Sequence, residues 1–103
     1  MTFNKFQQKN WKRCEAAFHP LWEIDKWALC IAGEAGELCN EVKKVYRGDF
    51  KLTERRPMIL AELSDIITYC DLAMSKLGAK TEVELLKKFE IVSARVHYLE
   101  EAK

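Results

Sequence analysis

Two long stretches of this chain repeat apolar residues at helical spacing, and each carries two acidic residues at the same place. The stretches are 31–42 and 59–70, and the acid pattern in both is E-x-x-[E/D]. Residues three apart share one face of a helix, so each stretch presents two carboxylates side by side. The four acids are Glu34, Glu37, Glu62 and Asp65. Because crowded carboxylates repel one another and resist the loss of water, a cation between the two pairs is the simplest interpretation.

Helical periodicity runs through the chain, whereas the alternation typical of strands is weak. With 4 glycines and 2 prolines among 103 residues, long helices are favoured. We predict four helices. The first covers about 2–18, and the second runs from 22 or 23 to 46. The third begins between 53 and 57 and ends at 77, and the fourth runs from 81 nearly to residue 103. Gly48 and Gly78 are expected to end the second and third helices, and Thr81 with Glu84 to form a capping box at the fourth. The expected fold is all-α: a single-domain four-helix bundle over 1–103 in which the two long central helices pack antiparallel.

On a helical wheel, the acids of both central helices border the apolar stripe on the same side. At about 100° per residue, they lie roughly 240° to 300° from Ile31 in one helix and from Ile59 in the other. Glu41 and Tyr69 fall in the same sector. We place no Lys or Arg at this edge, so salt bridges between the helices explain the pattern less well. An oxygen-only ligand set is typical of Mg²⁺, with Mn²⁺ as a substitute, and Mg²⁺ held by a few carboxylates indicates phosphate chemistry.

The sequence disfavours other metal chemistries. Di-iron helical bundles use Glu-x-x-His, but the residues three before His19 and His97 are Ala16 and Ala94. No Cys or His pair has the spacing of zinc ligands. Neither a P-loop nor a G-x-S-x-G motif occurs, so the acids stay the main candidate site.

One turn beside the first acid pair is almost bare of side chains. Gly33 and Gly36 each cost about 1 kcal/mol relative to Ala within a helix, and Ala32 and Ala35 accompany them. Close packing against another helix explains such a turn. Space for a bulky ligand beside the acids explains it as well, and the two explanations are compatible.

Composition narrows the class of partner. The chain has 17 basic and 16 acidic residues and a net charge of +1, which gives no general surface for nucleic acid or for a membrane. It contains no run of about 18 apolar residues and no apolar signal-peptide core within 1–10. The cysteines form no C-x-x-C motif, and we interpret them as reduced core thiols of a cytoplasmic protein. They are Cys14, Cys30, Cys39 and Cys70.

Basic and aromatic residues near the acids are candidates for substrate binding. Six cations surround the connection between the central helices: Lys43, Lys44, Arg47, Lys51, Arg55 and Arg56. Most are expected to be solvated, with one or two reaching a triphosphate held by the metal. Trp27 is expected to anchor the core, whereas the flat ring of Phe18 or Trp22 suits a nucleobase. Tyr69, on the acid edge of the third helix, is a candidate for the pocket wall. The full set of candidate substrate-binding residues is Phe18, Trp22, Glu41, Lys44, Tyr69, Lys88 and Arg95.

Two strings of residues carry a family resemblance. They are Ala32-Gly33-Glu34-Ala35-Gly36-Glu37 followed by Lys43-Lys44, and Glu62-Leu63-Ser64-Asp65 followed by Tyr69. In this order they resemble the MazG-like all-α nucleoside triphosphate pyrophosphohydrolases, in the short single-domain form of bacteria and phages. The resemblance covers about 22–77 and extends more loosely to the last helix. There the chain departs from the family, since Lys88-Phe89 is followed by Glu90 where related short forms often carry Asn.

The resemblance implies an activity and an assembly. The four acids would hold Mg²⁺ and be catalytic, water would attack the α-phosphorus of a (deoxy)nucleoside triphosphate, and the products would be the monophosphate and pyrophosphate. Glu34 or Glu37 would accept the proton of the water. The cellular role implied is the cleaning or control of the nucleotide pool. Family members are usually homodimers or homotetramers, often with the pocket near a subunit interface. The alternatives are a non-catalytic helical interaction module that keeps the fold and, disfavoured by the net charge, a small DNA-binding regulator.

Overall fold

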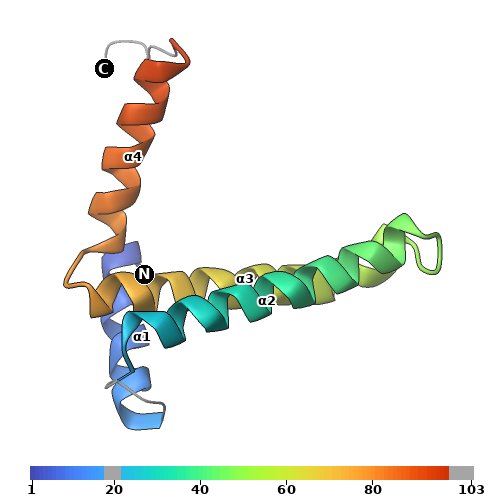
Figure 1. Ribbon diagram of the computed structural model, residues 1–103, viewed down its shortest axis with the longest axis horizontal. Helices are drawn as coiled ribbons and strands as arrows, with labels where there is room; N and C mark the ends of the chain where they lie inside the picture. The colour runs from blue at the N-terminus through green and yellow to red at the C-terminus, as the bar shows by residue number, and fades with distance from the viewer. Residues whose placement is uncertain (18–21, 98–103) are drawn as a thin grey trace.

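The computed structural model describes residues 1–17 and 22–97, and within these ranges every regular element is a helix. The four helices are α1 (Phe3–Ala17), α2 (Ile24–Tyr46), α3 (Leu52–Lys76) and α4 (Thr81–Arg95) (Figure 1). The prediction of an all-α fold with four helices is therefore confirmed. Across these ranges, no helix combines the length and the apolarity needed to cross a membrane.

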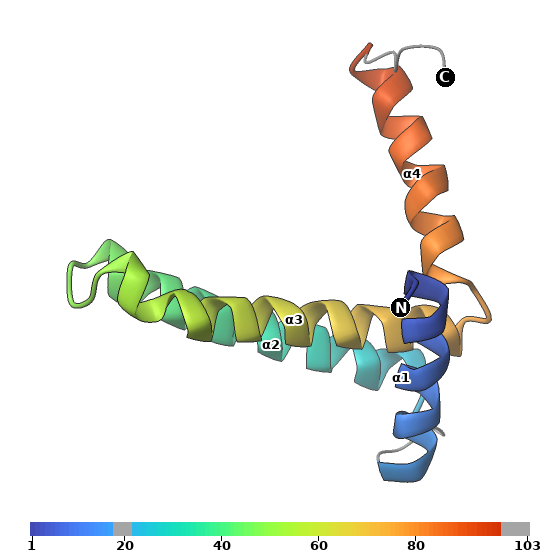
Figure 2. The same ribbon diagram turned by 180° about the vertical axis from the view of Figure 1, so that it is seen from behind.

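Helices α2 and α3 form a long antiparallel hairpin, as predicted for the two central helices. They lie side by side along their length in both views (Figures 1 and 2). Gly48 (φ 84°) and Gly78 (φ 75°) adopt the left-handed conformation just beyond the two helices, which glycine does without steric cost. Helix α3 begins at Leu52, slightly earlier than predicted. There the Glu54 carboxylate accepts a hydrogen bond from the backbone N–H of Lys51 (2.8 Å), which satisfies a free donor at the helix start.

A small core lies where α1 crosses the open end of the hairpin (Figure 2). Its buried residues are Cys14, Trp27, Leu72 and Ala73. Trp27 is 1% exposed, which confirms its predicted role as a core anchor. The prediction of core thiols is correct for Cys14 but wrong for Cys39, which is exposed, because α1 covers only the open end of the hairpin. The other two cysteines are half-buried.

A buried polar cluster fastens α1 and the start of α4 to α3. Asp71 is fully buried, and its carboxylate accepts hydrogen bonds from Asn10 Nδ2 (2.9 Å) and from the Thr81 hydroxyl. Gln7 Oε1 accepts a hydrogen bond from the backbone N–H of Thr81 (3.0 Å). We call Gln7, Asn10, Asp71 and Thr81 the polar clamp. The predicted capping box is wrong: Thr81 is the first residue of α4, and its hydroxyl donates to Asp71 instead of capping the helix.

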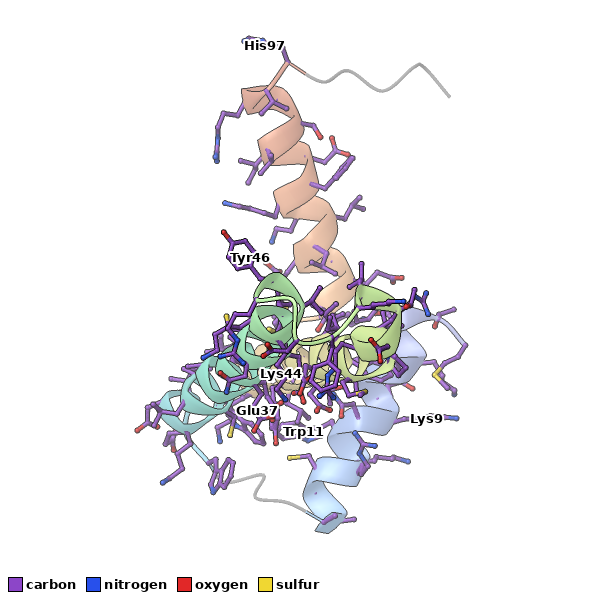
Figure 3. All side chains as sticks on the ribbon, turned by 90° about the vertical axis from the view of Figure 1, so that its right-hand side faces the viewer. Lys9, Trp11, Glu37, Lys44, Tyr46 and His97 are labelled. Carbon is purple, nitrogen blue, oxygen red and sulfur yellow. The ribbon has the colours of Figure 1, made fainter. Side chains whose placement is uncertain are left out.

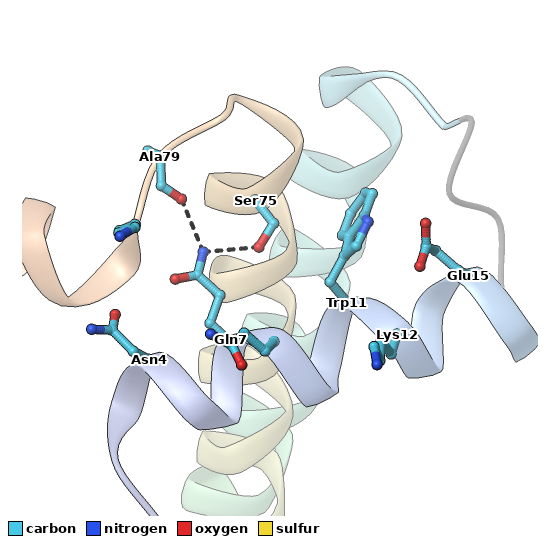
Figure 4. Close-up of a pocket in the computed structure, with 9 residues that line it drawn as sticks. Asn4, Gln7, Trp11, Lys12, Glu15, Ser75 and Ala79 are labelled. Atoms are coloured by element: carbon cyan, nitrogen blue, oxygen red, sulfur yellow. Dashed lines mark hydrogen bonds between the residues drawn. The ribbon is translucent and has the colours of Figure 1, made fainter.

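A pocket of about 470 Å³ lies between α1 and the connection from α3 to α4 (Figure 4). Gln7 lines it, and its two amide N–H groups already donate to Ser75 Oγ (2.9 Å) and to the Ala79 carbonyl (2.9 Å). Of the described residues that line the pocket, Glu15 alone is acidic. The pocket therefore lacks a ligand set for a cation and lies apart from the acids that the sequence singled out.

Helix α4 leaves a large apolar surface exposed. It projects away from the hairpin (Figures 1 and 2), and its exposed apolar side chains include Val83, Leu85, Leu86, Phe89 and Ile91. The radius of gyration is 16.7 Å, against about 13 Å for a compact domain of this length. The chain exposes 7876 Å², against about 6,000 Å² for a compact monomer of 12.0 kDa. A single copy thus exposes about 1,900 Å² more than its size requires.

Candidate metal centre

Three pairs of residues face each other across the α2–α3 hairpin at intervals of seven residues. The pairs are Trp27 with Tyr69, Glu34 with Glu62, and Glu41 with Arg55. Seven residues are nearly two helical turns, so the pairs lie on one side of the hairpin with about 10 Å between neighbours. The antiparallel arrangement accounts for the equal spacing of the pairs. Moving seven residues toward the C-terminus along α2 leads to the tip of the hairpin, and so does moving seven residues toward the N-terminus along α3.

The middle pair belongs to a cluster of three carboxylates. Glu34, Glu62 and Asp65 each offer one carboxylate oxygen, and these three oxygens lie within 4.8 Å of one another. Glu34 and Glu62 are half-buried, whereas Asp65 is exposed. We call these three residues the acid cluster. The fold thus brings together, from two helices, three of the four acids that the sequence singled out.

Two oxygens of the acid cluster are buried and, when both carboxylates are ionised, have no compensating donor among the described residues. Glu34 Oε2 and Glu62 Oε2 have no hydrogen-bond partner in the portion of the chain that the structure describes. A buried carboxylate oxygen that has lost its water and gained no donor is unfavourable. A cation bound between these oxygens would offset that loss, so the donor set fits a hard metal ion such as Mg²⁺ or Mn²⁺.

Burial, together with the neighbouring acids, also controls the protonation of the acid cluster. Burial, the contact with Glu62 and the charges of Glu37 and Asp65 raise the pKa of Glu34 to about 7. Burial also raises the pKa of Glu62, although the contact with Glu34 acts in the opposite direction. Near neutral pH the metal-free cluster therefore retains a proton for part of the time. Because a metal ion needs ionised carboxylates, its binding would release that proton.

Glu37 lies beside the acid cluster without joining it. Its charge contributes to the raised pKa of both Glu34 and Glu62, yet it supplies no oxygen to the group of three within 4.8 Å. It is exposed on α2, one turn beyond Glu34. Its side chain also contacts those of Glu34 and Glu62, so its carboxylate lies next to any ion that the acid cluster would bind.

Aromatic rings line the hairpin on the α1 side of the acid cluster. The Trp27 and Tyr69 ring centroids lie 6.3 Å apart, and those of Trp22 and Trp27 lie 5.1 Å apart. Trp27 is buried in the core, whereas Trp22 and Tyr69 are half-buried at its edges. Burial raises the pKa of the Tyr69 hydroxyl, with smaller contributions from Cys30 and the acids, so Tyr69 stays protonated and can donate a hydrogen bond.

Charged residues of both signs lie on the tip side of the acid cluster. Glu41 accepts a hydrogen bond from Lys44 Nζ (3.1 Å), and its other oxygen lies 3.7 Å from Arg55 Nε. The Arg55 guanidinium lies over the Phe50 ring, 3.8 Å from its centroid. The prediction that no Lys or Arg borders the acid edge is therefore wrong. Phe50 was not predicted, and Arg55 was only one of six cations among which one or two were expected to reach a triphosphate, although the seven-residue step back from Glu62 points to Arg55.

Other candidate residues do not meet the acids within one chain. Lys88 and Arg95 lie on α4, which rises away from the hairpin, as Figure 3 shows in the view that also labels Glu37 and Lys44. Phe18 lies outside the described residues. The structure therefore groups the other predicted residues along the hairpin and leaves the two cations of α4 apart from them.

The bare turn of α2 faces open space. A Cβ atom built on Gly33 or on Gly36 would meet no atom within 4 Å among the described residues, and both glycines are exposed. Packing against another helix of the same chain therefore does not explain them.

Comparisons with protein-family models, with curated proteins and with solved structures return no match for this chain. What bears on its activity is the chemistry of the hairpin itself. One side of the hairpin carries, in order, aromatic rings, a carboxylate cluster with two uncompensated oxygens, and a cationic end. Such an order can accommodate a ligand with a flat ring and anionic groups, with a cation between ligand and protein.

Proposed function

We propose that the protein is a Mg²⁺-dependent nucleoside triphosphate pyrophosphohydrolase with a helical bundle of the MazG-like type. The observation that carries this proposal is the convergence of Glu34, Glu62 and Asp65 from two helices, with a buried carboxylate oxygen of Glu34 and of Glu62 lacking a partner among the described residues. Mg²⁺ bound by a few carboxylates usually completes its shell with water and substrate phosphates. The resemblance of the two acidic strings to this enzyme family supports the same reaction class.

In the proposed reaction, water attacks the α-phosphorus of a (deoxy)nucleoside triphosphate. A bond forms between the water oxygen and the α-phosphorus, the bond to the bridging oxygen of the β-phosphate breaks, and pyrophosphate leaves. Bound Mg²⁺ supplies charge neutralisation for the phosphates. Glu37 is suited to accept the proton of the water, because its exposed carboxylate lies beside the acid cluster without belonging to the group of three oxygens.

The aromatic side of the hairpin is the proposed place for the base. Trp22 and Tyr69 are half-buried next to the core residue Trp27, and flat rings of this kind stack on nucleobases. The protonated hydroxyl of Tyr69 offers a hydrogen-bond donor at the same place. Stacking accepts any base, so the choice of base depends on the remaining polar contacts of the pocket.

We further propose that two or four copies associate through α4. The excess of about 1,900 Å² of exposed surface per copy is what a large interface would cover, and α4 offers it a set of exposed apolar side chains on a helix that projects from the hairpin. Lys88 and Arg95 lie on the same helix, so a role for them in substrate binding depends on the second copy. The bare turn of Gly33 and Gly36 is a second place for its approach.

The first test is an assay of pyrophosphate release from a panel of NTPs and dNTPs, in Mg²⁺ and in EDTA, with chromatography of the products. We expect monophosphate and pyrophosphate in Mg²⁺ and no turnover in EDTA. Glu62→Gln and Asp65→Asn should abolish turnover with the helical circular dichroism unchanged, whereas Glu82→Gln, at an exposed acid of α4, should not alter it.

Three results would contradict the proposal. The first is normal activity in both acid-cluster variants, and the second is release of inorganic phosphate with a diphosphate product. The third is silence across the panel together with no Mg²⁺-dependent rise in the melting temperature, since a ligand that binds the folded state must stabilise it. The third result would favour the non-catalytic interaction module.

A further inference from the structure

The cationic end of the hairpin holds its arginine in a defined position. Arg55 is 18% exposed, and its guanidinium lies over the Phe50 ring (3.8 Å to the centroid) and beside the Glu41 carboxylate. A ring beneath the guanidinium and a carboxylate next to it restrict where this long side chain can point. The other cations around the connection at 47–51 are Lys43, Lys44, Arg47, Lys51 and Arg56, of which only Lys44 is half-buried like Arg55.

The ion pair between Arg55 and Glu41 is incomplete. The distance from Nε to Oε2 is 3.7 Å, which is too long for a hydrogen bond. Both atoms are buried and have no hydrogen-bond partner in the described part of the chain. Glu41 also accepts a hydrogen bond from Lys44, so one carboxylate serves two cations. Arg55 Nε is buried against Glu41, so it is the other nitrogens of the guanidinium that offer unused hydrogen-bonding capacity, and an anion is the partner that would use it.

Arg55 also has a fixed relation to the acid cluster. It lies seven residues before Glu62 on α3, and its partner Glu41 lies seven residues after Glu34 on α2. The two pairs are thus on the same side of the hairpin, about 10 Å apart along its axis. The aromatic pair lies an equal step away in the opposite direction. This order of rings, metal ligands and cation matches the order of base, metal-bound phosphates and terminal phosphate in a nucleoside triphosphate.

We propose that Arg55 binds the terminal phosphates of the substrate, so that the triphosphate runs from the acid cluster toward the tip of the hairpin. The inference rests on the proposed function. The planar guanidinium matches phosphate oxygens in a bidentate arrangement that Lys cannot reproduce. Because the β- and γ-phosphates leave together as pyrophosphate, Arg55 stabilises the leaving group as its negative charge grows. It also makes the enzyme require a triphosphate, since a monophosphate does not extend to this end.

The experiment compares Arg55→Gln and Arg55→Lys with the control Arg56→Gln, which removes the same charge from the exposed neighbouring position of α3. We expect Arg55→Gln to lower kcat/KM by about 10- to 100-fold, the effect of losing hydrogen bonds to a charged group. Product inhibition distinguishes a role of Arg55 in phosphate binding from a purely structural role. Inhibition by pyrophosphate should weaken by a similar factor, and inhibition by the nucleoside monophosphate should not change. Arg55→Lys should fall between wild type and Arg55→Gln.

The outcomes distinguish this inference from the proposed function. If wild type releases no pyrophosphate, the proposed function fails. If wild type is active and Arg55→Gln matches Arg56→Gln in kcat/KM and in pyrophosphate inhibition, only the role of Arg55 is overturned. An Arg55 that merely joins α2 to α3 would lower the melting temperature and leave pyrophosphate inhibition unchanged. Should Arg55→Gln fail to fold, Arg55→Lys decides by the same two measurements, because it keeps the charge and loses the planar fork.

Discussion

Replacing Leu86 by Glu tests whether the open surface of α4 is an interface between copies. Leu86 is 61% exposed in the single chain, so covering this exposed part in an interface contributes about 1–2 kcal/mol to association. A carboxylate buried there instead costs about 1–3 kcal/mol more. A two-fold symmetric dimer contains the site twice, which gives at least about 4 kcal/mol and raises the dissociation constant by about 10³. In an isolated chain, the same exposed substitution changes the free energy of unfolding by less than about 0.5 kcal/mol.

Sedimentation equilibrium over a range of protein concentrations measures this effect. We expect wild type to have at least twice the mass of the 12.0 kDa chain. An interface that hides about 1,900 Å² on each of two copies falls in the range of obligate dimers. Leu86→Glu should approach the mass of one chain, and Leu86→Met, which keeps the volume and the apolar character, should behave as wild type. A wild type that stays monomeric, or a Leu86→Glu variant as tightly associated as wild type, refutes the reasoning.

Three further predictions concern the polar clamp and the acid cluster. Asp71→Ala should lower the free energy of unfolding in urea by about 2–4 kcal/mol, because Asn10 and Thr81 lose their buried acceptor; a loss below about 1 kcal/mol would contradict the role given to the clamp. Without metal, thermal stability should fall as pH rises from 4.5 to about 7, since the raised pKa of Glu34 makes the folded state hold a proton that the unfolded chain releases. Mg²⁺ should remove this fall and Glu34→Gln should flatten it, so an equally steep profile in Glu34→Gln would assign it to another group. At pH 7, Mg²⁺ binding should release about half a proton. Calorimetry in two buffers of different ionisation enthalpy measures this number, and a release of zero would show that Glu34 does not bind the metal.

The helices of this chain could be predicted because their signals are local. Apolar spacing defines α2 and α3, and Gly48 and Gly78 mark where each can end. Roles that depend on distant partners could not be read in the same way. Thr81 has the sequence of a capping residue, yet it serves Asp71 and Gln7, ten and 74 residues away along the chain. The exposure of Cys39 likewise depends on where α1 crosses the hairpin.

The candidate site was predictable to the extent that it follows helix geometry. The helical wheel placed acids on the same side of two neighbouring helices, and the structure brings Glu34, Glu62 and Asp65 together. The cationic end depends instead on how the short connection returns the chain to α3, which sets Phe50 under Arg55. Composition around that connection offered six cations, of which Lys44 was selected as a candidate in place of Arg55. Whether the acid cluster binds Mg²⁺ and turns over a nucleotide stays a prediction.

The seven-residue register of the hairpin limits how this chain can change length during evolution. An insertion of one residue in α2 between Glu34 and Glu41 would turn the following segment by about 100° and advance it by 1.5 Å. The cationic end would then lose its alignment with the acids while both helices remained intact. A longer or shorter connection at 47–51 leaves every pairing in place. We therefore expect variation in length among related chains to accumulate at the tip of the hairpin, where an insertion or deletion does not change the alignment of the three pairs.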